Sequence, residues 1–143
     1  METSEVRKRL QHATRVARQR AEAHRAQVAA TEDTYTDFLR HVAAPLTRQV
    51  ADVLRAEKVA VTISTPTAGL RLTLDRGRDN YIEFALDSES DPPQVIGRTS
   101  LGRGSRTRTD ERPVKPGNGP EAVSEDDFLA FLLDALAPWL ERA

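Results

Sequence analysis

The period of the hydrophobic pattern changes along this chain, and the change limits the folds that it can adopt. Up to about residue 57, apolar residues recur at steps of three and four, which is typical of helices. From Val59 they alternate with polar residues in several short runs, as in strands, and after Ser124 the helical spacing returns. Helices, then strands, then a single helix predict an α+β fold.

Residues 4–29 predict one long helix that lies apart from the core. The segment is rich in Ala, Arg, Gln and Glu and contains no Gly or Pro. Its apolar face is mostly alanine and buries little area, so this helix needs a partner surface to be stable. We therefore predict a helical arm at residues 1–30 and a single α+β domain at residues 31–143. The apolar positions of the arm are Val6, Leu10, Ala13, Ala17, Ala21 and Val28.

Residues 32–57 carry a stronger apolar face, which predicts a second helical segment packed on the core. Pro45 interrupts this segment. Because proline removes a backbone hydrogen bond and clashes with the preceding turn, the helix is either kinked near His41 or split, with Pro45 opening the second piece. The apolar positions are Tyr35, Phe38, Leu39, Val42, Leu46, Val50, Val53 and Leu54.

The alternating runs predict an antiparallel meander sheet of four or five strands. Three runs within residues 59–87 are joined by turn-forming segments, and a fourth is expected at about residues 94–101. Residues 105–109 alternate without an apolar face, as a charged edge strand does. Since the first three runs have one apolar and one polar face, we expect the second and last helices to pack on one face of the sheet.

The last helix is expected to begin at Ser124. Serine is a favoured N-cap, and the three acids that follow it favour the positive end of the helix dipole. Pro138 is expected to bend the final turn. The apolar surface of this helix is broad and includes Phe131 and Trp139. Its area is larger than one small sheet is able to cover. The residues expected to meet in one interior are Leu72, Phe84 and Leu132.

The sequence lacks the residue combinations that common catalytic chemistry needs. It has no cysteine, which excludes thiolate nucleophiles, disulfides and cysteine metal sites. His12 and His24 lie too far apart for one metal cluster on a helix, and His41 is expected to be a partly buried structural residue. No phosphate-loop triplet follows the glycines near residue 100. We expect no enzyme activity, no catalytic residue, no metal and no cofactor.

Charge and hydropathy predict a cytoplasmic protein that does not engage a membrane. The N-terminus lacks the apolar run of a secretory signal, and no stretch approaches the roughly 20 apolar residues that a membrane span requires. The absence of cysteine fits a reducing compartment. The formal net charge is −1, so no overall field attracts the chain to nucleic acid or to acidic membranes.

Our first hypothesis is a non-enzymatic protein-interaction module, adaptor or chaperone-like, that forms a homodimer. Helices flanking a sheet resemble small secretion-chaperone domains, although those have a helix between the strands that this sequence does not predict. The surplus of apolar residues over what the sheet covers favours contact with a protein. The predicted contacts are the arm residues Leu10, Ala13, Ala17, Ala21 and Val28, and any exposed part of the last helix, with Phe131 and Trp139.

The alternative hypothesis is nucleic-acid binding through a basic segment at residues 98–115, aided by the basic arm. Arginines on a strand, separated by Thr, Ser and Gly, suit contacts with a phosphate backbone. The segment lacks the aromatic residues that stack on bases, and its arginines are also expected to pair with Glu83, Asp87 and the acidic last helix. The arginines concerned are Arg98, Arg103, Arg106, Arg108 and Arg112.

Overall fold

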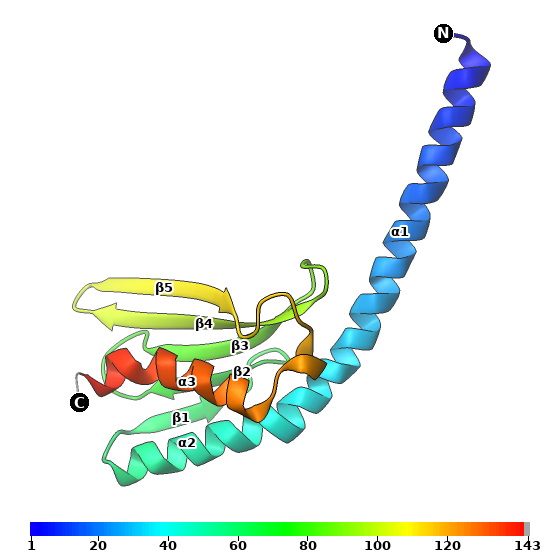
Figure 1. The fold of residues 1–143 in the computed structure, drawn as a ribbon. Helices are drawn as coiled ribbons and strands as arrows, with labels where there is room; N and C mark the ends of the chain where they lie inside the picture. The colour runs from blue at the N-terminus through cyan, green and yellow to red at the C-terminus, as the bar shows by residue number, and fades with distance from the viewer. Residues whose placement is uncertain (142–143) are drawn as a thin grey trace.

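The computed structural model describes residues 1–141 and contains a long N-terminal helix, an antiparallel sheet and a C-terminal helix (Figure 1). This order confirms the α+β prediction. A π-helical turn, η1, joins the first two helices, and a short 3-10 helix, η2, precedes the last. The elements are α1 (Thr3–Phe38), η1 (Leu39–Ala43), α2 (Ala44–Ala56), β1 (Val61–Ser64), β2 (Leu70–Leu74), β3 (Tyr81–Asp87), β4 (Gln94–Arg103), β5 (Arg106–Pro113), η2 (Pro120–Ala122) and α3 (Glu125–Leu140).

The chain remains helical from α1 through η1 into α2, and the predicted irregularity lies in η1. The turn is wider than an α-helical one, since the Ala44 N–H donates to the carbonyl of Leu39. A wider turn accommodates the ring of Pro45, which lies in the first turn of α2 and has no N–H to donate. The long helix changes direction near this turn (Figure 1). The expected boundary of the arm, residue 30, lies inside α1 without a break.

The five strands pair in chain order, and every neighbouring pair is antiparallel, which confirms the meander. The charged segment predicted at residues 105–109 is an edge strand, and β5 extends beyond it to Pro113. Gly104 has a φ of +61° in the turn that joins β4 to β5, a conformation that glycine adopts without steric cost. The sheet therefore has a highly charged strand at one edge, as soluble sheets commonly do.

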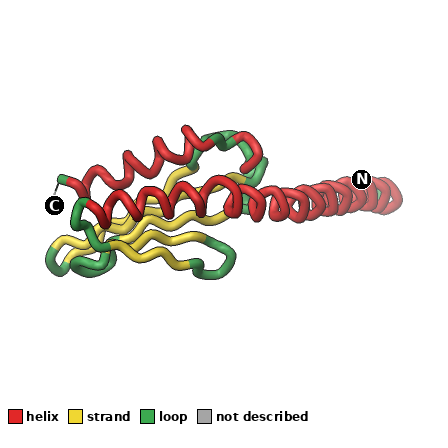
Figure 2. The backbone as a smooth tube through the Cα atoms, turned by 90° about the horizontal axis from the view of Figure 1, so that it is seen from below, coloured by secondary structure: helices red, strands yellow, loops and turns green. Residues whose placement is uncertain are grey.

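Helices α2 and α3 form one layer over one face of the sheet, as predicted (Figure 2). Leu72, Phe84 and Leu132 are all fully buried and belong to the same core. The prediction that these three residues meet in one interior is therefore confirmed. Burial of a large apolar side chain contributes roughly 1.5–3 kcal/mol, so the interface between sheet and helices is the main source of stability.

Ser124 caps α3 as the sequence predicts. Its hydroxyl accepts a hydrogen bond from the Asp127 backbone N–H, and the Asp127 carboxylate accepts one from the Ser124 backbone N–H. The hydrogen bond from the Ser124 backbone, with a contribution from Lys115, lowers the pKa of the Asp127 carboxyl. Pro138 lies inside α3, which continues to Leu140. The cap fixes where α3 begins over the sheet.

Gly97 sets how closely α3 approaches the sheet. It lies on β4 opposite Phe84 of β3, with its missing side chain directed at the ring of Phe131 on α3. A methyl group built at this position would collide with that ring. The Phe131 ring also contacts Phe84 edge-on, with 5.6 Å between the ring centroids. The absence of a side chain at Gly97 therefore makes room for an aromatic ring of α3.

We predict that Gly97→Ala lowers the free energy of unfolding by about 1–3 kcal/mol, because the added methyl overpacks the interface between β4 and α3. Urea denaturation of the purified variant measures the loss. Phe131→Leu shortens the opposing side chain, so the double variant should lose less than the sum of the two single variants. Additive losses would show that the glycine and the ring do not share this space.

Candidate interaction surfaces

The N-terminal part of α1 projects from the domain (Figure 1). It carries an apolar stripe that is exposed over most of its length. Leu10 is 64% exposed, and the three alanines of the stripe are also exposed, while Val28 is partly buried. The contacts of α1 with other elements lie mainly with η1 and η2, at the base of the arm. The structure thus places all five predicted arm residues on one helix outside the core: Leu10, Ala13, Ala17, Ala21 and Val28.

The base of the arm is anchored in the core by two aromatic side chains. Tyr35 and Phe38 are each 5% exposed, with their ring centroids 6.4 Å apart. Phe38 also meets Phe128 of α3 edge-on at 5.7 Å. The last turns of α1 are therefore held by the same core as α2 and α3. Since α1 is a single helix, this anchor sets the direction in which the arm projects.

Tyr35 places a polar group, its phenol hydroxyl, among the buried side chains at the base of the arm. Its buried hydroxyl has no hydrogen-bond partner among the residues that the structure describes. Burial raises the pKa of the Tyr35 phenol well above its ordinary value of 10.0, and the Glu83 carboxylate adds to the rise. The neutral phenol is therefore strongly favoured in the folded state, while the unfolded chain ionises near the ordinary pKa.

We predict that Tyr35→Phe raises the free energy of unfolding by up to about 1 kcal/mol at neutral pH, because it removes an unpaired buried hydroxyl. In the native protein, the contribution of the raised pKa to the free energy of unfolding is fully present below pH 10. It is lost as pH rises beyond 10, because the unfolded chain then releases a phenol proton that the folded state keeps. The variant should therefore lose less stability than the native protein between pH 9 and about 11. Urea titrations across this range measure the difference, with Tyr81→Phe as the control. Equal losses in both proteins would contradict the assignment to Tyr35.

The expectation that Phe131 and Trp139 lie on an exposed part of the last helix is wrong. They are only 6% and 4% exposed, because α3 turns both rings into the core. Phe131 fills the space over Gly97. Exposed apolar side chains of α3 lie on its outer side instead, at Leu133 and Leu140. These two residues were not singled out from the sequence, although the apolar residues all round this helix carried the signal.

Leu133 and Leu140 line a groove between α2 and α3, which we call the α2/α3 groove. Its volume is about 420 Å³. Val53 is the most exposed apolar residue of this lining, at 63%. The lining contains two polar residues, Gln49 and Glu57. The remaining lining residues are Leu46, Val50, Leu54, Leu129 and Leu136.

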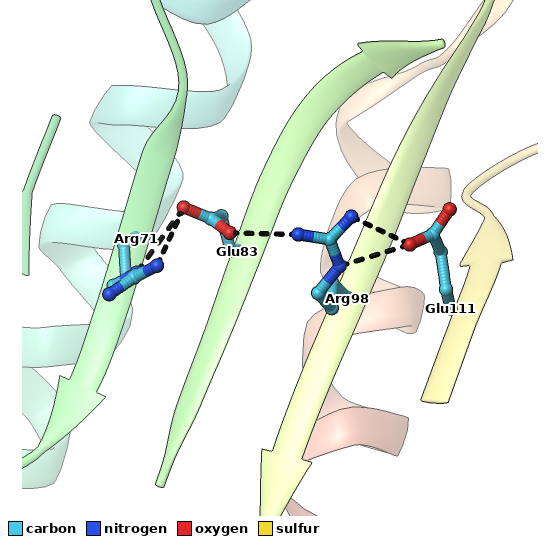
Figure 3. A network of polar contacts seen from close by, with 4 residues as sticks. All are labelled: Arg71, Glu83, Arg98 and Glu111. Atoms are coloured by element: carbon cyan, nitrogen blue, oxygen red, sulfur yellow. Dashed lines mark hydrogen bonds and ion pairs between the residues drawn. The ribbon is translucent and has the colours of Figure 1, made fainter. Parts of the chain in front are cut away.

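The uncovered face of the sheet carries a row of alternating charges (Figure 3). Glu83 accepts from Arg71 at 3.0 Å and lies 3.7 Å from Arg98, which donates to Glu111 at 2.8 Å. The four residues are direct neighbours across β2, β3, β4 and β5. The expectation that arginines of the basic segment pair with Glu83 is confirmed for Arg98. Asp87 is different, since its carboxylate accepts from the backbone N–H of Glu89.

The other arginines of the basic segment lie in two environments. Arg112 donates to Asp134 of α3 at 2.7 Å and lies over the ring of Phe131, so it pairs with the last helix as expected. Arg103, Arg106 and Arg108 are exposed near the β4–β5 turn and form no ion pair with the acids of residues 1–141. The segment thus contains two arginines held by acids and three that remain available at one end of the sheet.

The described residues contain no arrangement typical of a metal site or of a membrane span. Within residues 1–141, no three residues with His, Asp or Glu side chains come together as metal ligands. No helix in this range has the length and apolar character to cross a bilayer. The expectation of a partly buried His41 is wrong, since the residue is exposed and its ring Nδ1 donates to the Asp37 carbonyl at 3.0 Å.

Comparison with known proteins does not assign a family to this chain. No protein-family model matches it, and we found no significant similarity to a curated protein or to a solved structure. We therefore infer function from three surfaces of the fold: the apolar stripe of the arm, the α2/α3 groove and the basic β4–β5 turn. The first, which we call the arm stripe, consists of Leu10, Ala13, Ala17, Ala21 and Val28.

Proposed function

We propose that this protein is a non-enzymatic protein-interaction module, of the adaptor or chaperone-like type, that self-associates through its helical arm. One observation carries the proposal. The apolar face of α1 is buried at Tyr35 and Phe38 and is exposed at Leu10, although both ends belong to the same helix. A face that packs where the domain reaches it, and is bare where the domain does not, favours a second partner.

The arm gains little from its own domain, which supports the need for a partner. From Thr3 to residue 30 it extends roughly 40 Å, at about 1.5 Å per residue. Isolated helices are only marginally stable in water, and most helical stability in proteins comes from packing of an apolar face. The alanines of the stripe allow another helix to approach closely, within the usual interaxial range of about 8–10 Å.

We predict that the protein is a dimer and that Ala17→Glu combined with Ala21→Glu raises the dissociation constant of this dimer at least tenfold. These substitutions place two carboxylates in an apolar contact and should leave the fold intact, since both alanines are exposed on the arm. Light scattering across a concentration series measures the mass, which should be twice the chain mass of 15.9 kDa.

The matched control is Gln19→Glu combined with Ala26→Glu. It adds the same number of carboxylates to the arm, but the helical period places them opposite the stripe. This variant should remain dimeric. A native protein that is monomeric at every concentration, or a control that dissociates as readily as the stripe variant, would overturn self-association through the arm.

Nucleic-acid binding is the second candidate function, and the three unpaired arginines near the β4–β5 turn support it. Arg103, Arg106 and Arg108 lie close together and are exposed, and residues 1–30 add seven basic residues against three acidic ones. The pairing of Arg98 and Arg112 with acids counts against a continuous basic surface. The arm stripe is therefore the better-supported site.

If the turn binds nucleic acid, Arg106→Gln with Arg108→Gln should weaken binding and reduce the slope of log affinity against log salt by about two, roughly one for each lost phosphate contact. Fluorescence anisotropy with labelled duplex DNA and single-stranded RNA at low salt measures both quantities. Arg40→Gln with Arg48→Gln on the long helix is the control. The absence of binding by the native protein at low salt would remove this candidate.

A further inference from the structure

Large apolar side chains are exposed in two places on the part of the chain that the structure describes. One is the start of the arm, which we call the arm tip: Met1, Val6 and Leu10 are 89%, 47% and 64% exposed. The other is the α2/α3 groove, where Val53, Leu133 and Leu140 are 63%, 53% and 48% exposed. Both surfaces are apolar. The arm tip is a row of side chains on one helix, and the α2/α3 groove lies between two others.

The arm tip cannot enter the groove of its own chain. The arm is continuous with α2 and projects away from the domain (Figure 1). Val53 and Leu140 lie near the C-terminal ends of α2 and α3, at the end of the domain opposite the point where the arm leaves it (Figure 1). An arm tip that fills this groove therefore belongs to another copy.

We propose that the arm tip of one copy docks in the α2/α3 groove of a second copy. This inference rests on the proposed self-association and identifies the surface that binds the arm. The dimensions agree, since Val6 to Ala17 spans about 17 Å and α2, with 13 residues, spans about 20 Å. Val6, Leu10 and Ala13 have the i, i+4, i+7 spacing by which an amphipathic helix seats in an apolar groove.

Charge complementarity supports this occupant and sets its direction. The arm tip carries three consecutive basic residues, Arg7, Lys8 and Arg9, of which Arg9 pairs with Glu5 of the same helix at 3.1 Å. Helices α2 and α3 both end at the same end of the domain (Figure 1), where Glu57 and Glu141 follow their last turns. The bases at this end are Arg55, which pairs with Asp52, and Lys58, which follows Glu57. The negative ends of two helix dipoles and two carboxylates thus face that end. An arm that enters with its N-terminus there lies antiparallel to both helices and brings unlike charges together.

Reciprocal exchange of arms closes the assembly as a dimer. Each copy contributes one tip and one groove, so a two-fold axis satisfies both surfaces without further copies. Pairing of arm with arm alone would leave the α2/α3 groove exposed. It would also bring the arginines of two basic arms together, and like charges that face each other across an interface are destabilising. The arginines concerned are Arg15, Arg18, Arg20 and Arg25.

Cysteine cross-linking tests the docking directly, because the native chain has no cysteine. Leu10→Cys and Leu133→Cys are made in separate full-length chains, one with an affinity tag, and are mixed and treated with a short bismaleimide. Both side chains are exposed, so neither change disturbs the core. The control mixes Leu10→Cys with Ser64→Cys, an exposed position on β1. The mass of each mixture before cross-linking is measured by light scattering.

We expect the Leu10→Cys and Leu133→Cys mixture to give a cross-linked heterodimer at least fivefold more abundant than the control mixture. Strong linking within Leu10→Cys alone would show that arms pair with arms, and strong linking within Leu133→Cys alone would show that grooves pair with grooves. Arms paired with arms, or a dimer without links in the test mixture, overturn groove docking and leave self-association through the arm standing. Grooves paired with grooves overturn both proposals. A monomer in every mixture and in the native protein overturns both proposals.

Discussion

The contact between Phe84 of β3 and Phe128 of α3 is the interaction on which the rest of the structure depends. Their ring centroids are 4.6 Å apart, and both side chains are fully buried. Phe38, from the end of α1, meets Phe128 edge-on at 5.7 Å. Three elements that are distant in the sequence are thus joined by one aromatic cluster. Such rings bury large areas, and their edge-to-face contacts add to the stability that burial provides.

This aromatic cluster fixes the base of a helix that is only marginally stable by itself, and so sets the direction in which the arm projects. The apolar stripe of the arm is too small to hold the helix against solvent, but its base is fixed by Tyr35 and Phe38. The π-helical turn at η1 keeps the helix continuous past Pro45. The position of the arm is therefore a property of the core. A partner that binds the arm meets a surface whose direction the domain has already set, which reduces the entropy lost on association.

Charges are distributed so that the uncovered sheet face is largely self-contained, whereas the arm is not. In the row of Arg71, Glu83, Arg98 and Glu111, each charge pairs with an opposite charge on a neighbouring strand. By contrast, the arm is basic and α3 has acids in its first turn and no base in its last. Exposed ion pairs contribute little to stability, typically about 0.2–1 kcal/mol each. Their importance here is that they remove the sheet face from the set of surfaces that need a partner.

The sequence by itself determined the kind and order of the elements, because the helical and strand periods are local properties of the chain. It also determined the cap at Ser124, the charged edge strand and the arm, whose small apolar face stands out from the segment that follows. Only the tertiary structure decided which side of α3 is buried. Apolar residues surround that helix, so nothing local separates Phe131, which fits over Gly97, from Leu133, which lies outside. Strand register likewise decided which acid each arginine meets, because partners such as Arg98 and Glu83 become neighbours only when β3 and β4 pair.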